Sequence, residues 1–131
     1  MRNKVLFIDN DDEDLDILMV ALDSLKFTEY KMFNCPTKMF EYLENLSPEE
    51  LPEIIVTDYN MPRLTGCELI LEVKNTMQYY DIKFLVLSTS QSIRFKEDCL
   101  QAGALEFKVK PDSLDDYQLV LGNILGLLRA S

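Results

Sequence analysis

Short apolar runs alternate with stretches of helical periodicity along the 131-residue chain. Each run has the near-continuous apolar character of a strand that is buried on both faces. Strict alternation of such strands with amphipathic helices favours a parallel sheet covered by helices on both sides. We therefore expect an α/β fold, a three-layer doubly wound sandwich with five helices and five strands, at 5–8, 30–34, 53–58, 83–90 and 105–111.

Capping residues set the expected limits of several helices. The acidic stretch after Ile8 is typical of a helix start, because carboxylates interact favourably with the positive end of the helix dipole. Thr37 is a candidate cap for the second helix, and Gly103 is expected to close the fourth. The last helix is expected to run from Leu114 to Leu128.

Length and charge exclude several classes of protein. The chain is long enough for one domain, so we expect a single domain over residues 1–131 without an output domain. A formal net charge of −10 argues against nucleic acid and anionic membranes as partners. We find neither an apolar run long enough to span a bilayer nor a secretory pattern, and we expect a cytoplasmic protein.

The chain has three cysteines and no histidine. Cys35, Cys67 and Cys99 form no C-x-x-C pair, so we interpret them as reduced core thiols that form neither a disulfide nor a zinc site. The lack of histidine excludes Ser-His-Asp and Cys-His nucleophiles and histidine-ligated metals. Chemistry in this chain therefore has to rely on carboxylates, hydroxyls and lysine.

Polar residues stand where four of the expected strands end. The first strand is followed by Asp9-Asn10-Asp11, the third ends in Asp58, the fourth in Ser88 and the fifth near Lys110. In doubly wound sheets, sites form beyond the carboxyl ends of the strands. Carboxylates favour a hard cation such as Mg²⁺, and a lysine with a hydroxyl suits a phosphoryl group carried on Asp58.

These motifs resemble the receiver domains of two-component response regulators, in particular the stand-alone chemotaxis-regulator type. The resemblance rests on the acidic residues after the first strand, "TDYNMP" with Asp58, "LSTS" with Ser88 and "KVKP" with Lys110. It covers essentially the whole chain and implies the flavodoxin-like strand order 2-1-3-4-5. It further implies that Asp58 accepts a phosphoryl group from a phosphohistidine, with Mg²⁺ as cofactor.

The resemblance assigns a role to each matching position. Asp58 matches the phospho-acceptor, Lys110 the phosphate-contacting lysine, Ser88 the switch hydroxyl and Phe107 the switch aromatic. The implied metal ligands are Asp9, Asn10, Asp58 and the backbone carbonyl of Asn60. The Lys110-Pro111 bond is expected to be cis, as is typical of the family. No activity is implied beyond self-catalysed phosphoryl transfer and slow autodephosphorylation.

Asn10 departs from the family pattern, which has an acidic residue at this position. A neutral amide removes one formal charge, so we expect weaker metal binding than an all-acid pocket gives. Asp11 is a possible substitute. Acids at a helix start also have a purely local explanation, and we assign Asp12, Glu13 and Asp14 to it. Without the family, Phe107 is interpreted as a core residue.

Two other functions compete with this interpretation. "LFIDND" also fits the start of haloacid-dehalogenase-like phosphotransferases, with Asp9 as nucleophile and Asp11 as acid/base. The alternative to both is a receiver-like binding module that acts without phosphorylation, which Asn10 favours. Identifying the aspartate that becomes phosphorylated, Asp58 or Asp9, separates these possibilities.

The family also implies partners. The donor is expected to be a histidine kinase or a histidine phosphotransfer protein, acting in trans because the chain has no histidine. The downstream target is unknown, and the family implies that it contacts the fourth helix, fifth strand and last helix. Leu119, Val120 and Leu127 are apolar residues left over from the core stripe of the last helix, and Gly122 and Gly126 leave space there. This helix is therefore a candidate homodimer contact.

Overall fold

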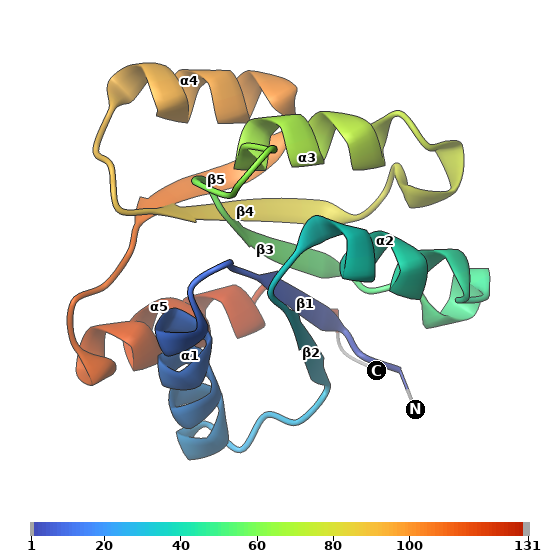
Figure 1. Cartoon of the computed structure of the whole chain (residues 1–131). Helices are drawn as coiled ribbons and strands as arrows, with labels where there is room; N and C mark the ends of the chain where they lie inside the picture. Colours follow the sequence, from blue (N-terminus) through green and yellow to red (C-terminus); the bar gives the residue numbers. More distant parts are fainter. Residues whose placement is uncertain (1, 130–131) are drawn as a thin grey trace.

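All five strands form one parallel sheet in the order β2-β1-β3-β4-β5, as expected (Figure 1). The computed structural model describes residues 2–129. Its strands are β1 (Val5–Ile8), β2 (Tyr30–Phe33), β3 (Ile54–Asp58), β4 (Lys83–Ser88) and β5 (Ala104–Val109). Its helices are α1 (Asp12–Ser24), α2 (Pro36–Glu44), α3 (Gly66–Lys74), α4 (Ile93–Ala102) and α5 (Leu114–Leu125), with 3₁₀ turns at Pro48–Glu50 and Met77–Tyr79.

The helices cover both faces of the sheet. Figure 1 shows α1 and α5 on one side and α2, α3 and α4 on the other. Because successive strand residues point to opposite faces, Leu6 and Ile8 pack toward α2 and α3, whereas Val5 and Phe7 pack toward α1 and α5. Burial on both faces explains why the strands are apolar throughout.

Local signals placed several helix ends correctly, but α5 ends at Leu125 and not at the expected Leu128. Asp11 caps α1 by accepting a hydrogen bond from the Glu13 backbone N–H, and Gly103 closes α4 with a φ of 120°. The expected cap at Thr37 is wrong, because α2 already begins at Pro36 with Cys35 as its N-cap residue. Proline suits the first turn of a helix, where its missing N–H has no helical partner.

The expectation that all cysteines are free thiols is also wrong. Cys67 of α3 and Cys99 of α4 form a disulfide with a Cα–Cα distance of 4.8 Å, and Cys35 is free. Both bridged residues are buried in the core between α3 and α4. Sequence spacing alone does not show that two neighbouring helices turn these side chains toward each other.

Strand register aligns the carboxyl ends of the sheet. Asp58, the last residue of β3, pairs with Leu87 of β4, so Ser88 lies one residue beyond it. The Lys110 backbone N–H donates to the Ser88 carbonyl at 2.7 Å, which fixes where the chain leaves β5. Among residues 2–129, no helix is long and apolar enough to cross a membrane.

Candidate functional site

Buried acidic side chains and one lysine meet at the carboxyl ends of β1, β3 and β5. Asp9 directly follows β1, Asp58 ends β3, and Lys110 follows β5. The side chains of all three are at least nine-tenths buried. Gly66 keeps α3 close to this point, since a Cβ at Gly66 would lie 2.8 Å from the Asp58 carbonyl oxygen.

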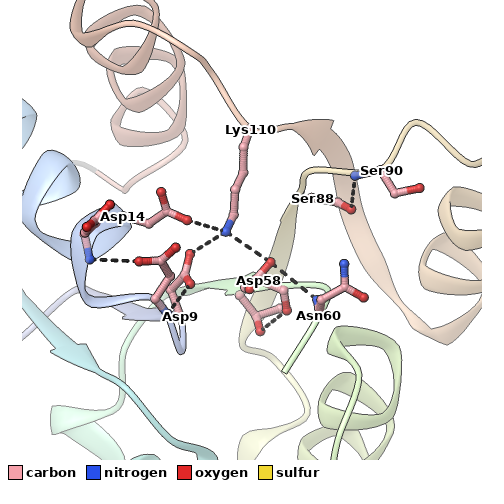
Figure 2. Close-up of polar contacts among 10 residues, drawn as sticks. Asp9, Asp14, Asp58, Asn60, Ser88, Ser90 and Lys110 are labelled. Carbon is pink, nitrogen blue, oxygen red and sulfur yellow. Dashed lines mark hydrogen bonds and ion pairs between the residues drawn. The ribbon is translucent and has the colours of Figure 1, made fainter. Parts of the chain in front are cut away.

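Lys110 is the centre of the pocket (Figure 2). Its Nζ lies 2.7 Å from Asp14 Oδ2, 2.8 Å from Asp9 Oδ2 and 3.3 Å from Asp58 Oδ1. Burial lowers the pKa of Lys110, but the carboxylates of Asp14 and Asp9 outweigh burial and hold its pKa above the ordinary value. The lysine is therefore a fixed positive charge at this end of the sheet.

Asp58 carries an unfavourable charge. Burial and the neighbouring Asp9 carboxylate raise the pKa of Asp58 to about 6, although Lys110 opposes the shift. Burial also raises the pKa of Asp9, against its hydrogen bond from Lys110. One lysine does not fully compensate these carboxylates, so the pocket favours a further cation.

Asn10 lies against the acceptor side of the pocket. When its amide is oriented as the neighbouring acceptors require, Nδ2 donates to the Asn60 carbonyl at 2.9 Å and to Asp58 Oδ2 at 3.2 Å. Both acceptors belong to the expected metal ligands. In this orientation Asn10 offers a donor to them, and its amide has to turn over before Oδ1 can bind a cation.

Asp11 and Asp14 exchange the roles that the sequence suggested. The Asp11 carboxylate caps α1 at 2.9 Å from the Glu13 backbone nitrogen and makes no ion pair to Lys110 among the described residues. Asp14, which we assigned to the helix start alone, instead makes the shortest contact to Lys110. No local signal in the sequence distinguishes Asp14 from the other acids of the first turn of α1.

The remaining expected residues lie nearby, with two differences from expectation. Ser88 is fully buried, and its Oγ accepts a hydrogen bond from the Ser90 backbone N–H at 3.0 Å, on the side of Lys110 away from Asp14 (Figure 2). Phe107 is already buried, so it needs no switching event to turn inward. The described residues contain no cis peptide bond, and the expected cis Lys110-Pro111 bond is therefore wrong.

The oxygen ligands of the pocket suit a hard cation that needs only one or two carboxylates. Asp9 and Asp58 supply carboxylate oxygens, Asn60 a backbone carbonyl and Asn10 an amide oxygen after rotation. Mg²⁺ is commonly bound by one or two carboxylates with the remaining positions filled by water and phosphate oxygens. Residues 2–129 contain no cluster of three or more Asp, Glu, His or Cys arranged as metal ligands. The two carboxylates and the two uncharged oxygens fit the ligand types that Mg²⁺ takes.

Comparison with known proteins identifies the family. The profile described as "Response regulator receiver domain" matches residues 5–121. The chain belongs to this family. The expected family, the receiver domains of two-component systems, and the expected fold are both confirmed.

Sequence relatives of this receiver domain are two-component proteins. It is 25% identical to the two-component response regulator ARR6 of Arabidopsis thaliana over 92% of this chain and 68% of the relative. It is 34% identical to ARR7 of the same plant over 53% of this chain and 36% of the relative. The match to histidine kinase P4 of Formosa agariphila is 31% identical over 61% of this chain and spans 6% of that protein.

Solved structures share the receiver fold. The phosphorylated cyanobacterial phytochrome response regulator RcpA has a TM-score of 0.80 at 21% identity, covering 95% of this chain and 91% of RcpA. The Mn²⁺-bound response regulator Rcp1 has a TM-score of 0.78 at 18% identity, covering 98% and 99% of the two chains. At these identities the likeness establishes the fold and not the chemistry.

Proposed function

We propose that this receiver domain accepts a phosphoryl group on Asp58 from a phosphohistidine of a partner protein and thereby switches a protein-binding face. The observation that carries the proposal is the contact of Lys110 Nζ with Asp58 Oδ1 at 3.3 Å in a buried pocket. A buried carboxylate beside a fixed cation is a nucleophile whose charge is partly balanced before the phosphoryl group arrives.

The transfer itself needs little from the protein beyond positioning and charge compensation. A carboxylate oxygen of Asp58 forms a bond to phosphorus while the bond between phosphorus and the donor imidazole nitrogen breaks. The imidazole leaves with its electron pair and takes up a proton from water. Lys110 stabilises the negative charge on the phosphoryl oxygens. Ser88, at the end of the adjacent β4, accepts from the Ser90 N–H and keeps its own hydroxyl hydrogen to donate to the phosphoryl group.

Mg²⁺ is the cofactor that we propose, held by Asp9, Asp58, the Asn60 carbonyl and the amide oxygen of Asn10. When bound, it neutralises charge between these oxygens and the phosphoryl group. The raised pKa values of Asp9 and Asp58 support this, because burial disfavours both charged carboxylates and a bound cation would favour them. Asn10 must release the Asn60 carbonyl when it turns toward the cation.

An apolar groove beside the pocket suits a docking donor. The groove has a volume of about 420 Å³, and Asp14 lines both the groove and the pocket. A phosphohistidine that approaches Asp58 past Asp14 would bring its protein onto this groove. We therefore propose that the donor protein, a histidine kinase or histidine phosphotransfer protein, packs on the apolar lining formed by Ile17, Val20, Pro111, Leu114 and Tyr117.

The output is proposed to lie on the face formed by α4, β5 and α5. Tyr59, next to Asp58, contacts both Phe95 of α4 and Phe107 of β5. A shift of the Asp58 backbone or of Ser88 therefore acts directly on these elements. Since Phe107 is already buried, the proposed change is a rearrangement of α4 and its preceding loop and does not involve insertion of the Phe107 ring.

Intact-mass analysis after incubation with acetyl phosphate and Mg²⁺ tests the proposal. We expect one added phosphoryl group on the wild type and none on Asp58→Asn, with Asp9→Asn reduced because a metal ligand is lost. Labelling that survives in Asp58→Asn but not in Asp9→Asn would support the dehalogenase-like alternative. A wild type that takes no phosphoryl group, even from a phosphohistidine protein, would support the phosphorylation-independent binding module.

A further inference from the structure

Asp14 is the pocket residue that the family pattern does not account for. It lies on the first turn of α1, and its Oδ2 is 2.7 Å from Lys110 Nζ, the shortest of the three ion pairs of that lysine. Figure 2 shows Lys110 reaching between Asp14 and Asp58. The ion pair of a carboxylate with a buried ammonium is stronger than the interaction of an exposed acid with a helix dipole. The contact with Lys110 is therefore the main interaction of Asp14.

Asp14 also restores the charge that Asn10 removes. With Asn10 neutral, the expected motif positions supply two carboxylates, Asp9 and Asp58, and Asp14 brings the number around Lys110 to three. The position of the charge differs. Asn10 faces Asp58 and the Asn60 carbonyl, whereas Asp14 faces Lys110. Compared with the family pattern, one negative charge is missing beside the expected metal ligands and one is added beside Lys110.

This placement matters because the donors of an ammonium group are few. Lys110 has three N–H donors, and three carboxylates lie within ion-pair distance of them. A phosphoryl group on Asp58 adds oxygens that need the same donors. To contact the phosphoryl oxygens fully, Lys110 must give up a carboxylate, and the Asp14 carboxylate is the nearest one.

We propose that Asp14 is a positioning residue of the acceptor site, which holds Lys110 in place and competes with the phosphoryl group on Asp58 for its ammonium. This inference rests on the proposed function of Asp58. It assigns to Asp14 a direct influence on how strongly the pocket binds a phosphoryl group. Removing the Asp14 carboxylate is expected to strengthen binding of the phosphoryl group, whereas removing a residue that only supports the structure would weaken it.

Equilibrium binding of beryllofluoride, a tetrahedral stand-in for the phosphoryl group on a carboxylate, tests the proposal. Titration in the presence of Mg²⁺ by calorimetry is expected to show roughly three- to tenfold tighter binding for Asp14→Asn than for the wild type. Asp14→Glu retains the charge and is expected to return the affinity toward the wild-type value. The matched control is Asp12→Asn, which removes a carboxylate from the same turn of α1 without an ion pair to Lys110.

A second readout follows the lysine itself. In ¹⁵N-labelled protein, the Lys110 ammonium resonance is expected to be protected from solvent exchange in the wild type and in Asp12→Asn, and less protected in Asp14→Asn. Asp14→Ser serves as a second variant if Asp14→Asn does not fold. Unchanged or weaker beryllofluoride binding in the folded Asp14 variants overturns the role of Asp14. If the wild type is still phosphorylated on Asp58 by acetyl phosphate, the proposed function remains intact. A wild type that neither binds beryllofluoride nor is labelled overturns both.

Discussion

The ring of Tyr59 stacks on the ring of Phe95 with their centroids 4.4 Å apart and their planes at 16°. Tyr59 follows Asp58 in the chain, whereas Phe95 lies on α4, one helical turn before Cys99. Offset aromatic pairs of this kind add about 0.5–1.5 kcal/mol beyond the area they bury. The acceptor strand and α4 are therefore in direct contact, and the disulfide to α3 anchors the same helix.

Reduction of the Cys67–Cys99 disulfide is expected to destabilise the protein. The bridge joins residues 32 positions apart, and closing a loop of that size stabilises a fold by roughly 3–4 kcal/mol in the chain-entropy description. Urea unfolding of oxidised and reduced protein measures the difference. Cys35→Ser is the control, since Cys35 is free. Three titratable thiols in protein purified without reductant would contradict the bridge.

Asp58→Asn is expected to stabilise the metal-free protein at neutral pH. The folded-state pKa of Asp58, about 6, lies above the ordinary value of 3.8, so ionisation of Asp58 opposes folding. This cost is absent below about pH 4 and complete above about pH 6, where the variant should gain roughly 1–3 kcal/mol. Urea unfolding in EDTA at pH 4, 6 and 8 checks it. A gain that does not grow with pH would show that the Asp58 charge is well compensated.

Asn10→Asp is expected to tighten Mg²⁺ binding, because an added negative charge attracts the cation in a buried pocket. Without Mg²⁺ the same variant should be less stable, since a carboxylate replaces an amide that donates to Asp58 and to the Asn60 carbonyl. Calorimetric titration and urea unfolding measure the two effects. Asn123→Asp adds the same charge on the exposed surface of α5 and serves as control. Equal Mg²⁺ affinity in Asn10→Asp and wild type would exclude position 10 from the ligands.

Val20→Ser is expected to slow phosphoryl transfer several-fold when the donor is a histidine phosphotransfer protein that phosphorylates the wild type. Phosphorylation by acetyl phosphate, which needs no docking surface, is expected to be unchanged. Val20 is 54% exposed in the apolar groove, so the change removes donor contacts and little core packing. Met77→Ser, at an exposed apolar residue elsewhere, is the control. Equal transfer to Val20→Ser and wild type would place the donor on another surface.

The C-terminal helix is expected to form a homodimer contact. Leu119 of α5 is 69% exposed, and a Cβ at Gly122 would meet nothing within 4 Å apart from the helix's own nearby backbone. Leu127 is also exposed but follows the end of α5 at Leu125. Val120, in contrast, packs against the core and is not available. Sedimentation of phosphorylated and unphosphorylated protein measures association, and Leu119→Lys should weaken it. Monomers at high micromolar concentration in both states would exclude the dimer.

Several features of this protein follow from the sequence alone. The periods of the apolar residues distinguish strands from helices, because each element must bury a continuous face. A parallel sheet then gathers Asp9, Asp58, Ser88 and Lys110 at one edge, since the carboxyl ends of its strands lie together. For this reason the fold class and these four polar residues could be predicted from the sequence, whereas Asp14 could not.

The tertiary structure alone decided which of these side chains contact each other. Asp14 and Lys110 are 96 positions apart, and their ion pair depends on how α1 is rotated against the sheet. The Cys67–Cys99 bridge depends in the same way on which sides α3 and α4 turn toward each other. Periodicity indicates that a helix has a buried face, but its rotation and the reach of each side chain are set by packing between elements distant in the chain.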